Sequence, residues 1–164
     1  MRKGEKGILL TIGIVAIVAI IYKSVILATS TEKDPGIPFY TTASKDLQVK
    51  ASNLMRKYDC RDCHVVWAQR NIMQAVPAPS LDGIGSLRSE QWLYEYLSSK
   101  DPQSILPSRL KKEYRMPSFA SVPDDSRRAL AQYMSSLKVK DWYAKQTKKS
   151  EYEKLTGKDY QTTK

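Results

Sequence analysis

The chain has 164 residues, of which 41% are hydrophobic and 27% charged, and its net charge at pH 7 is +10. This composition excludes a mainly disordered chain and a protein that crosses a membrane many times, and two cysteines exclude a disulfide-rich scaffold. Because His64 is the single histidine, every site that needs two histidines is excluded as well. The chain is basic, but it carries no motif of a nucleic-acid-binding protein, so we expect no nucleic-acid partner.

The N-terminal segment has the length and composition of a transmembrane helix. Residues 8–28 are mostly apolar, with Lys23 near one end, and at about 1.5 Å per residue they span about 31 Å, close to the thickness of a bilayer core. Arg2, Lys3 and Lys6 precede this segment and predict a cytoplasmic N-terminus, with the rest of the chain on the periplasmic or extracytoplasmic side of the membrane. A cleaved signal peptide is the alternative, and it would export the same domain.

Composition divides the chain into four parts. A transmembrane anchor (or uncleaved signal) covers residues 1–28, a linker covers 29–43, a globular domain covers 44–138, and a basic extension rich in Lys and Tyr covers 139–164. The linker contains Pro, Gly and several Thr and Ser residues, so we expect it to be extended. The C-terminal extension is barely amphipathic, which fits a helix packed on the domain, a helix packed on a partner, or a mobile tail.

The first helix of the globular domain is predicted from Ser44, a good N-cap residue, to about Tyr58. Its apolar side chains share one helical face, at Leu47, Ala51, Leu54, Met55 and Tyr58. Residues 65–88 contain two prolines and two glycines without a regular apolar pattern. We expect this segment to be a loop with a short helical turn.

Two further helices are predicted. The second covers residues 90–100 after a serine N-cap, and we expect Pro102 to stop it. An irregular loop with three prolines follows, and the last helix begins near Pro123, where Ser121 and Asp124 have the spacing of a capping box. No segment alternates like a set of strands, so the predicted fold class is all-α.

The motif Cys60-Arg-Asp-Cys63-His64 carries the most functional information in the sequence. The pattern CxxCH attaches haem c, because two thiols three residues apart reach the two vinyl groups of the porphyrin and His64 is then held beneath the iron as an axial ligand. This attachment takes place outside the cytoplasm, in agreement with the N-terminal segment. The alternatives are a thioredoxin-like redox pair without its parallel sheet, a zinc site without a fourth ligand, or a disulfide that closes only a very short loop.

A second axial ligand of the iron has to be a residue other than histidine, and four methionines besides the initiator are candidates. Met55 and Met134 fall at core-facing positions of predicted helices, and Met73 follows His64 by only nine residues. Met116 lies in a proline-containing loop 52 residues after His64, a separation long enough to reach the opposite haem face. The alternative for Met116 is a buried side chain that fills a gap in the core.

The order of these features resembles that of the class I, mono-haem c-type cytochromes over about residues 44–138. That family also has a first helix, CxxCH, a proline-bearing loop, a helix, a Met-Pro loop and a closing helix. The resemblance implies an all-α fold of about four helices around one covalently bound haem c, with the first and last helices packed across each other. It also implies that Cys60 and Cys63 hold the haem and that His64 and Met116 are the axial ligands. The carbonyl of Pro79 would accept a hydrogen bond from the ring of His64.

The stretch from Trp92 to Phe119 is also similar to membrane-anchored haem c subunits of respiratory complexes, although Val65-Val66-Trp67 replaces the small, Gly-containing segment that many members carry. This similarity implies single-electron transfer, rather than enzymatic turnover by the chain itself, within a quinol-oxidising or terminal oxidase complex. The partners would be redox proteins or other subunits of that complex. The alternatives are a free-standing electron shuttle and a haem c gas sensor with a displaceable Met ligand.

Two groups of residues have open roles. By the same resemblance, the basic residues around Met116 would line a docking rim at the exposed haem edge: Arg109, Lys111, Lys112 and Arg115. An ordinary solvated loop and neutralisation of the haem propionates are the alternatives. Trp67 is expected either to pack on the haem or to fill the core.

Overall fold

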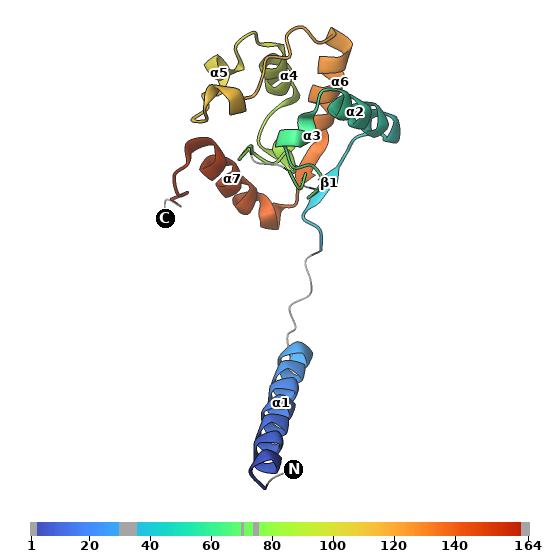
Figure 1. The fold of residues 1–164 in the computed structure, drawn as a ribbon. Helices are drawn as coiled ribbons and strands as arrows, with labels where there is room; N and C mark the ends of the chain where they lie inside the picture. Colours follow the sequence, from blue (N-terminus) through green and yellow to red (C-terminus); the bar gives the residue numbers. More distant parts are fainter. Residues whose placement is uncertain (1–2, 30–35, 70, 74–75, 162–164) are drawn as a thin grey trace. The chain divides into compact units, whose positions relative to one another are not determined.

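The computed structural model describes residues 3–29, 36–69, 71–73 and 76–161. It divides the chain into two compact units, Met1–Gly36 and Ile37–Lys164. The first unit contains the helix α1 (Lys3–Thr29), drawn in blue in Figure 1. Its segment Gly7–Ile26 has a mean hydropathy of 2.4 and is long and apolar enough to cross a membrane, a property that a signal sequence shares. Among the described residues of this unit, none of the side chains in that apolar segment is buried.

The second unit is mainly helical, which confirms the predicted fold class. Its helices are α2 (Lys45–Lys57), α3 (Cys60–Cys63), α4 (Glu90–Ser98), α5 (Pro102–Ile105), α6 (Asp124–Ser136) and α7 (Asp141–Thr156), with 3-10 turns η1 (Ile84–Ser86) and η2 (Lys112–Tyr114) (Figure 1). Two short strands, β1 (Phe39–Thr41) and β2 (Leu137–Val139), form an antiparallel pair that the sequence analysis did not predict. Three residues per strand are too few for a recognisable alternation of apolar and polar side chains.

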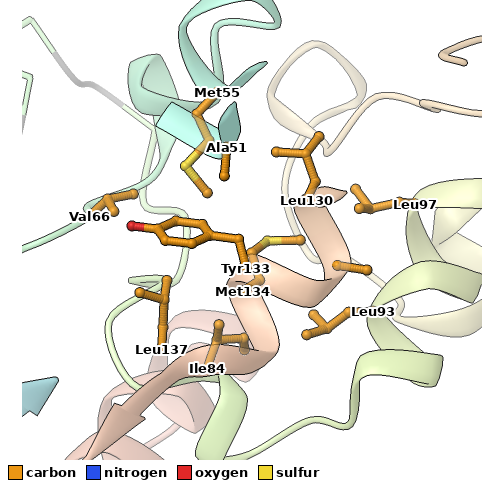
Figure 2. Packing of buried hydrophobic residues seen from close by; sticks show 11 residues of the cluster. Ala51, Met55, Val66, Ile84, Leu93, Leu97, Leu130, Tyr133, Met134 and Leu137 are labelled. Atoms are coloured by element: carbon orange, nitrogen blue, oxygen red, sulfur yellow. The ribbon is translucent and has the colours of Figure 1, made fainter. Parts of the chain in front are cut away.

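The core is built around α6, which packs against α2 on one side and α4 on the other (Figure 2). Ala51 of α2 and Ala131 of α6 are both completely buried in this core. Leu93 and Leu97 form the buried face of α4. The predicted packing of the first helix of the domain against its closing helix is therefore present.

Three details of the predicted helices are corrected by the structure. The helix predicted over residues 90–100 ends at Ser98. Pro102 begins α5, with Asp101 as its N-cap, because proline is favourable in the first turn of a helix. At the start of α6 the N-cap is Pro123, which has no side-chain oxygen, and the predicted capping box does not form. Instead Asp124 accepts hydrogen bonds from Tyr94 Oη at 2.5 Å and from Arg128 Nε at 2.6 Å.

The turn η1 packs unusually closely against the C-terminal end of α6. A Cβ atom built on Gly85 would lie 2.0 Å from the carbonyl oxygen of Ser135, which no side chain could tolerate. The ammonium of Lys138 donates to the carbonyl of Gly85 at 2.6 Å, and the backbone amide of Val139 donates to Oγ of Ser86 at 3.1 Å. Glycine at position 85 therefore permits this crossing of η1 and α6.

The C-terminal extension forms α7 and packs on the domain, which selects one of the three possibilities left open by its sequence. Tyr143 contacts Phe39 edge-to-face with ring centroids 5.5 Å apart. Thr147 is buried, and Glu151 forms an ion pair with Arg88 at 3.1 Å. These contacts are made to residues distant in the sequence, so the helix is held by tertiary contacts rather than by an apolar stripe of its own.

Candidate functional site

The CxxCH motif lies on the single-turn helix α3 and the residue that follows it. The backbone amide of His64 donates to the carbonyl of Cys60 at 3.0 Å, which closes this turn. Residues three apart on a helix share a face, and the two thiols and the imidazole line one cavity. Neither cysteine forms a disulfide, and among the described residues no group of three His, Cys, Asp or Glu side chains is placed to hold a metal ion. Burial raises the pKa of the Cys60 thiol to about 11.

The cavity beside the motif is large and almost entirely apolar. Its empty volume is about 1190 Å³, a figure that includes open solvent at its mouth. Its walls come from α3, α4, α6 and the loops around Pro79 and Met116. Two thiols, an imidazole and a thioether lie among apolar side chains, so the residues present fit a flat apolar macrocycle that carries a metal.

The side chain of His64 is held by a hydrogen bond from the loop opposite α3. Its Nδ1 lies 2.7 Å from the carbonyl oxygen of Pro79, the residue that the family resemblance indicated. A carbonyl oxygen can only accept, so this bond places the proton on Nδ1 and leaves the lone pair on Nε2. Burial lowers the pKa of His64, and the bond to Pro79 opposes that shift. The imidazole is therefore neutral and oriented, as a metal ligand has to be.

Met116 lines the same cavity as His64, and its loop is tied by hydrogen bonds to neighbouring segments. The side-chain amide of Gln103 donates to the carbonyl of Met116 at 3.3 Å, and Oγ of Ser118 donates to the carbonyl of Ser99 at 2.8 Å. Met73 is 86% exposed and does not line the cavity. The other two candidates, on α2 and α6, also line the cavity but lie in the buried cluster around Tyr133 that Figure 2 shows.

The four basic residues near Met116 are exposed, but they differ in their contacts. Arg109 donates from Nε to the carbonyl of Lys154 at 3.3 Å, and Arg115 donates from Nε to the carbonyl of Leu110 at 2.7 Å. Arg115 also lines the cavity. The remaining two, Lys111 and Lys112, flank the start of η2 and are exposed.

A buried carboxylate that the sequence analysis did not identify shapes the turn after the motif. Asp82 is only 5% exposed and accepts the backbone amides of Trp67 at 2.5 Å and Ala68 at 2.8 Å. Both of those residues have left-handed backbone angles, with φ of 57° and 55°. Trp67 donates from Nε1 to Oη of Tyr133 at 3.0 Å and does not line the cavity. Of its two predicted roles, Trp67 therefore takes the one in the core.

The sequence analysis also missed two cavity residues on α7. Glu151 and Leu155 line the cavity, although they lie beyond the predicted globular domain. Their spacing of four residues places both on one helical face. Only this spacing could have indicated them, and it is too short a pattern to distinguish from chance.

Comparison with known proteins identifies one related family. A family model described as Cytochrome c matches residues 48–138, which is more than half of the chain. The matched region begins within α2, includes the motif and the loops around Pro79 and Met116, and ends in β2. It does not include α1 or α7. No curated protein and no solved structure matches the chain.

Proposed function

Because this chain belongs to the cytochrome c family and binds one haem c covalently, we propose that it is a membrane-anchored protein that transfers single electrons on the extracytoplasmic side of a respiratory chain. The haem supplies the chemistry, a one-electron change between Fe(III) and Fe(II). The thiols of Cys60 and Cys63 would hold the ring, and His64 and Met116 would ligate its iron. The observation that supports this assignment is that all four side chains line one apolar cavity.

The side chains of His64 and Met116 would supply both protein ligands of the haem iron. The Nε2 lone pair of His64 is available because Nδ1 is bound to the carbonyl of Pro79. Met116 comes from a loop far along the chain and would occupy the opposite face. Iron held by both His64 and Met116 would keep no position open for a substrate, and the cavity walls are mostly apolar, so the site is suited to electron transfer rather than to chemistry on a substrate.

The membrane anchor and the C-terminal extension favour a subunit of a respiratory complex. The span Gly7–Ile26 would confine the haem domain to the membrane surface, where quinol-oxidising complexes and terminal oxidases act. Trp142 of α7 is half exposed and offers contact area for a permanent partner. A free-standing shuttle is the second candidate, and stoichiometric co-purification with other subunits would distinguish the two.

The test of the proposed function is the visible spectrum of the detergent-solubilised full-length protein, oxidised and reduced. We expect a low-spin haem c spectrum with the weak far-red band of a Met–iron bond, and haem that stays attached after denaturation. The double variant Cys60→Ser, Cys63→Ser is the control, and its haem should be lost on denaturation. Absence of haem from the wild-type protein, in a host that matures c-type cytochromes, would contradict the proposal. Carbon monoxide binding to the reduced wild-type protein would favour the gas sensor.

The basic rim around Met116 is expected to guide acidic redox partners. Replacement of both Lys111 and Lys112 by Glu should slow electron exchange with an acidic partner about tenfold at low ionic strength. The difference from the wild type should become smaller as salt is added, because charges at the edge of an interface act mainly on the association rate and are screened by ions. Stopped-flow kinetics at several salt concentrations measure this effect. The matched control replaces Lys145 and Lys148, which are exposed on α7, with the same change in net charge. Equal effects of the two double variants would exclude a local docking rim.

A further inference from the structure

One face of α7 is directed at the haem cavity and at the loops around it. Thr147 is buried, and Glu151 and Leu155 line the cavity. These three residues are spaced four apart and therefore lie on one side of the helix. Since α7 lies outside the region that the family model matches, its role is not explained by membership of the family.

We propose that α7 is a brace that joins the loop around Pro79 to the loop around Met116 and so limits opening of the haem cavity. This inference rests on the proposed function, because one loop supplies the carbonyl that orients His64 and the other carries Met116. Three contacts support it, made by Thr147, Glu151 and Lys154 of α7.

The first contact is made to the loop on the His64 side. An added Cβ atom at Gly83 would lie 3.2 Å from Cγ2 of Thr147 and 3.0 Å from Cβ of Val139, so the backbone of the loop touches α7 directly. Gly83 has a left-handed φ of 80° and follows Pro79 by four residues. A displacement of α7 would therefore reach the segment whose carbonyl orients His64.

The second contact is the ion pair between Arg88 and Glu151, which are 3.1 Å apart with side chains only 26% and 15% exposed. The guanidinium of Arg88 also lies over the ring of Trp92 at 5.0 Å from its centroid, and Trp92 lines the cavity. Burial raises the pKa of Glu151, while Arg88 opposes that shift. A partly desolvated pair of this kind is expected to be stronger than an exposed one.

The third contact is made to the loop on the Met116 side. Arg109, seven residues before Met116, donates to the carbonyl of Lys154 in the last turn of α7. Gly157 ends the helix with a left-handed φ of 69°, and an added Cβ there would lie 2.9 Å from Nε of Arg109. A cation at the C-terminal end of a helix is favourable because it interacts with the exposed carbonyl groups and the helix dipole.

These contacts make α7 a bridge across the cavity. The loops that bind a haem open and close locally, and opening is required before an external ligand can displace Met116. A helix fastened to both loops reduces the population of the open form. Loosening the brace should therefore increase local opening without unfolding α2, α4 and α6.

The test is amide hydrogen exchange of the oxidised full-length holoprotein, together with the rate of imidazole binding. In Glu151→Gln we expect amide exchange in residues 106–116 to be about tenfold faster. Imidazole binding should accelerate by the same factor. A tenfold change corresponds to a decrease of about 1.4 kcal/mol in the free energy of local opening. Exchange in α2 and α6 should not change. The charge-swapped pair Arg88→Glu with Glu151→Arg should recover part of the protection. The control is Lys149→Gln, which removes an ion pair within α7, at 3.9 Å from Glu153, on the outer side of the helix.

The outcomes separate this inference from the proposed function. If exchange in residues 106–116 is unchanged both in Glu151→Gln and in a chain truncated after Lys140, the brace is excluded. Equal effects of Lys149→Gln and Glu151→Gln would also exclude it. If the wild-type spectrum lacks the Met–iron band, the assignment of Met116 fails, whereas hydrogen exchange still decides whether α7 braces the two loops.

Discussion

Replacement of Gly85 by alanine is expected to destabilise the haem domain by about 3–5 kcal/mol, a large fraction of the stability of a typical domain. The added Cβ would lie 2.0 Å from the carbonyl oxygen of Ser135 and 2.9 Å from that of Met134. Both atoms belong to the backbone of α6 and cannot rotate away as a side chain could. The turn η1 would therefore have to move away from α6, and the core contact of Ile84 would be weakened with it.

The stability of Gly85→Ala can be measured by denaturant unfolding of the holoprotein, monitored by circular dichroism. Gly36→Ala is the control, since a Cβ there would meet no atom within 4 Å and Gly36 lies outside the unit that contains the haem domain, so the unfolding of that domain should not change. A loss below about 1 kcal/mol for Gly85→Ala would mean that η1 and α6 do not cross as closely as described.

Met116→Ala is expected to change the haem more than any other substitution outside the CxxCH motif. Loss of the thioether should abolish the far-red band, lower the reduction potential because a Met ligand favours Fe(II), and let carbon monoxide bind the reduced protein. Imidazole should bind the oxidised variant at least about a hundredfold more tightly than the oxidised wild type. This factor corresponds to a difference of about 2.8 kcal/mol in binding free energy, because imidazole no longer competes with Met116. Spectroscopy with ligand titration measures the band and the binding of carbon monoxide and imidazole, and redox potentiometry measures the potential.

Met73→Ala is the matched control for this experiment, because Met73 is highly exposed and lies outside the cavity. Its spectrum and potential should equal those of the wild type. Retention of the far-red band in Met116→Ala would assign the distal position to another residue. The two remaining candidates, Met55 and Met134, line the cavity from α2 and α6, and their replacement by Leu would then identify the ligand.

Features that depend on short stretches of sequence were largely predictable. Ser44 and Ser89 cap the helices that follow them because an N-cap needs only a side-chain oxygen and an amide three residues away. The CxxCH pattern is equally local, and the structure places its three side chains in one cavity. The family resemblance indicated Pro79, whose carbonyl does lie beside Nδ1 of His64.

Boundaries set by competing signals were predicted less well. Pro102 was expected only to stop a helix, whereas it also begins α5, because the same ring that blocks a helix interior is favourable in its first turn. Asp124 has the spacing of a capping residue, but the hydroxyl of Tyr94 and the guanidinium of Arg128 bind its carboxylate instead. The hydrogen-bond partners of such a carboxylate depend on which side chains the fold brings close to it, and these cannot be predicted from spacing along the chain.

The sequence by itself determined the class of the protein: an apolar segment able to span a membrane, amphipathic helices, and a motif that attaches one haem c. Only the tertiary structure decided how the haem cavity is enclosed. Asp82 supports the turn at Trp67 from 15 residues away, and Glu151 reaches Arg88 from the C-terminal extension. Local patterns record helix faces and motifs because their residues are neighbours in the chain, whereas these contacts exist only after folding has brought distant segments together.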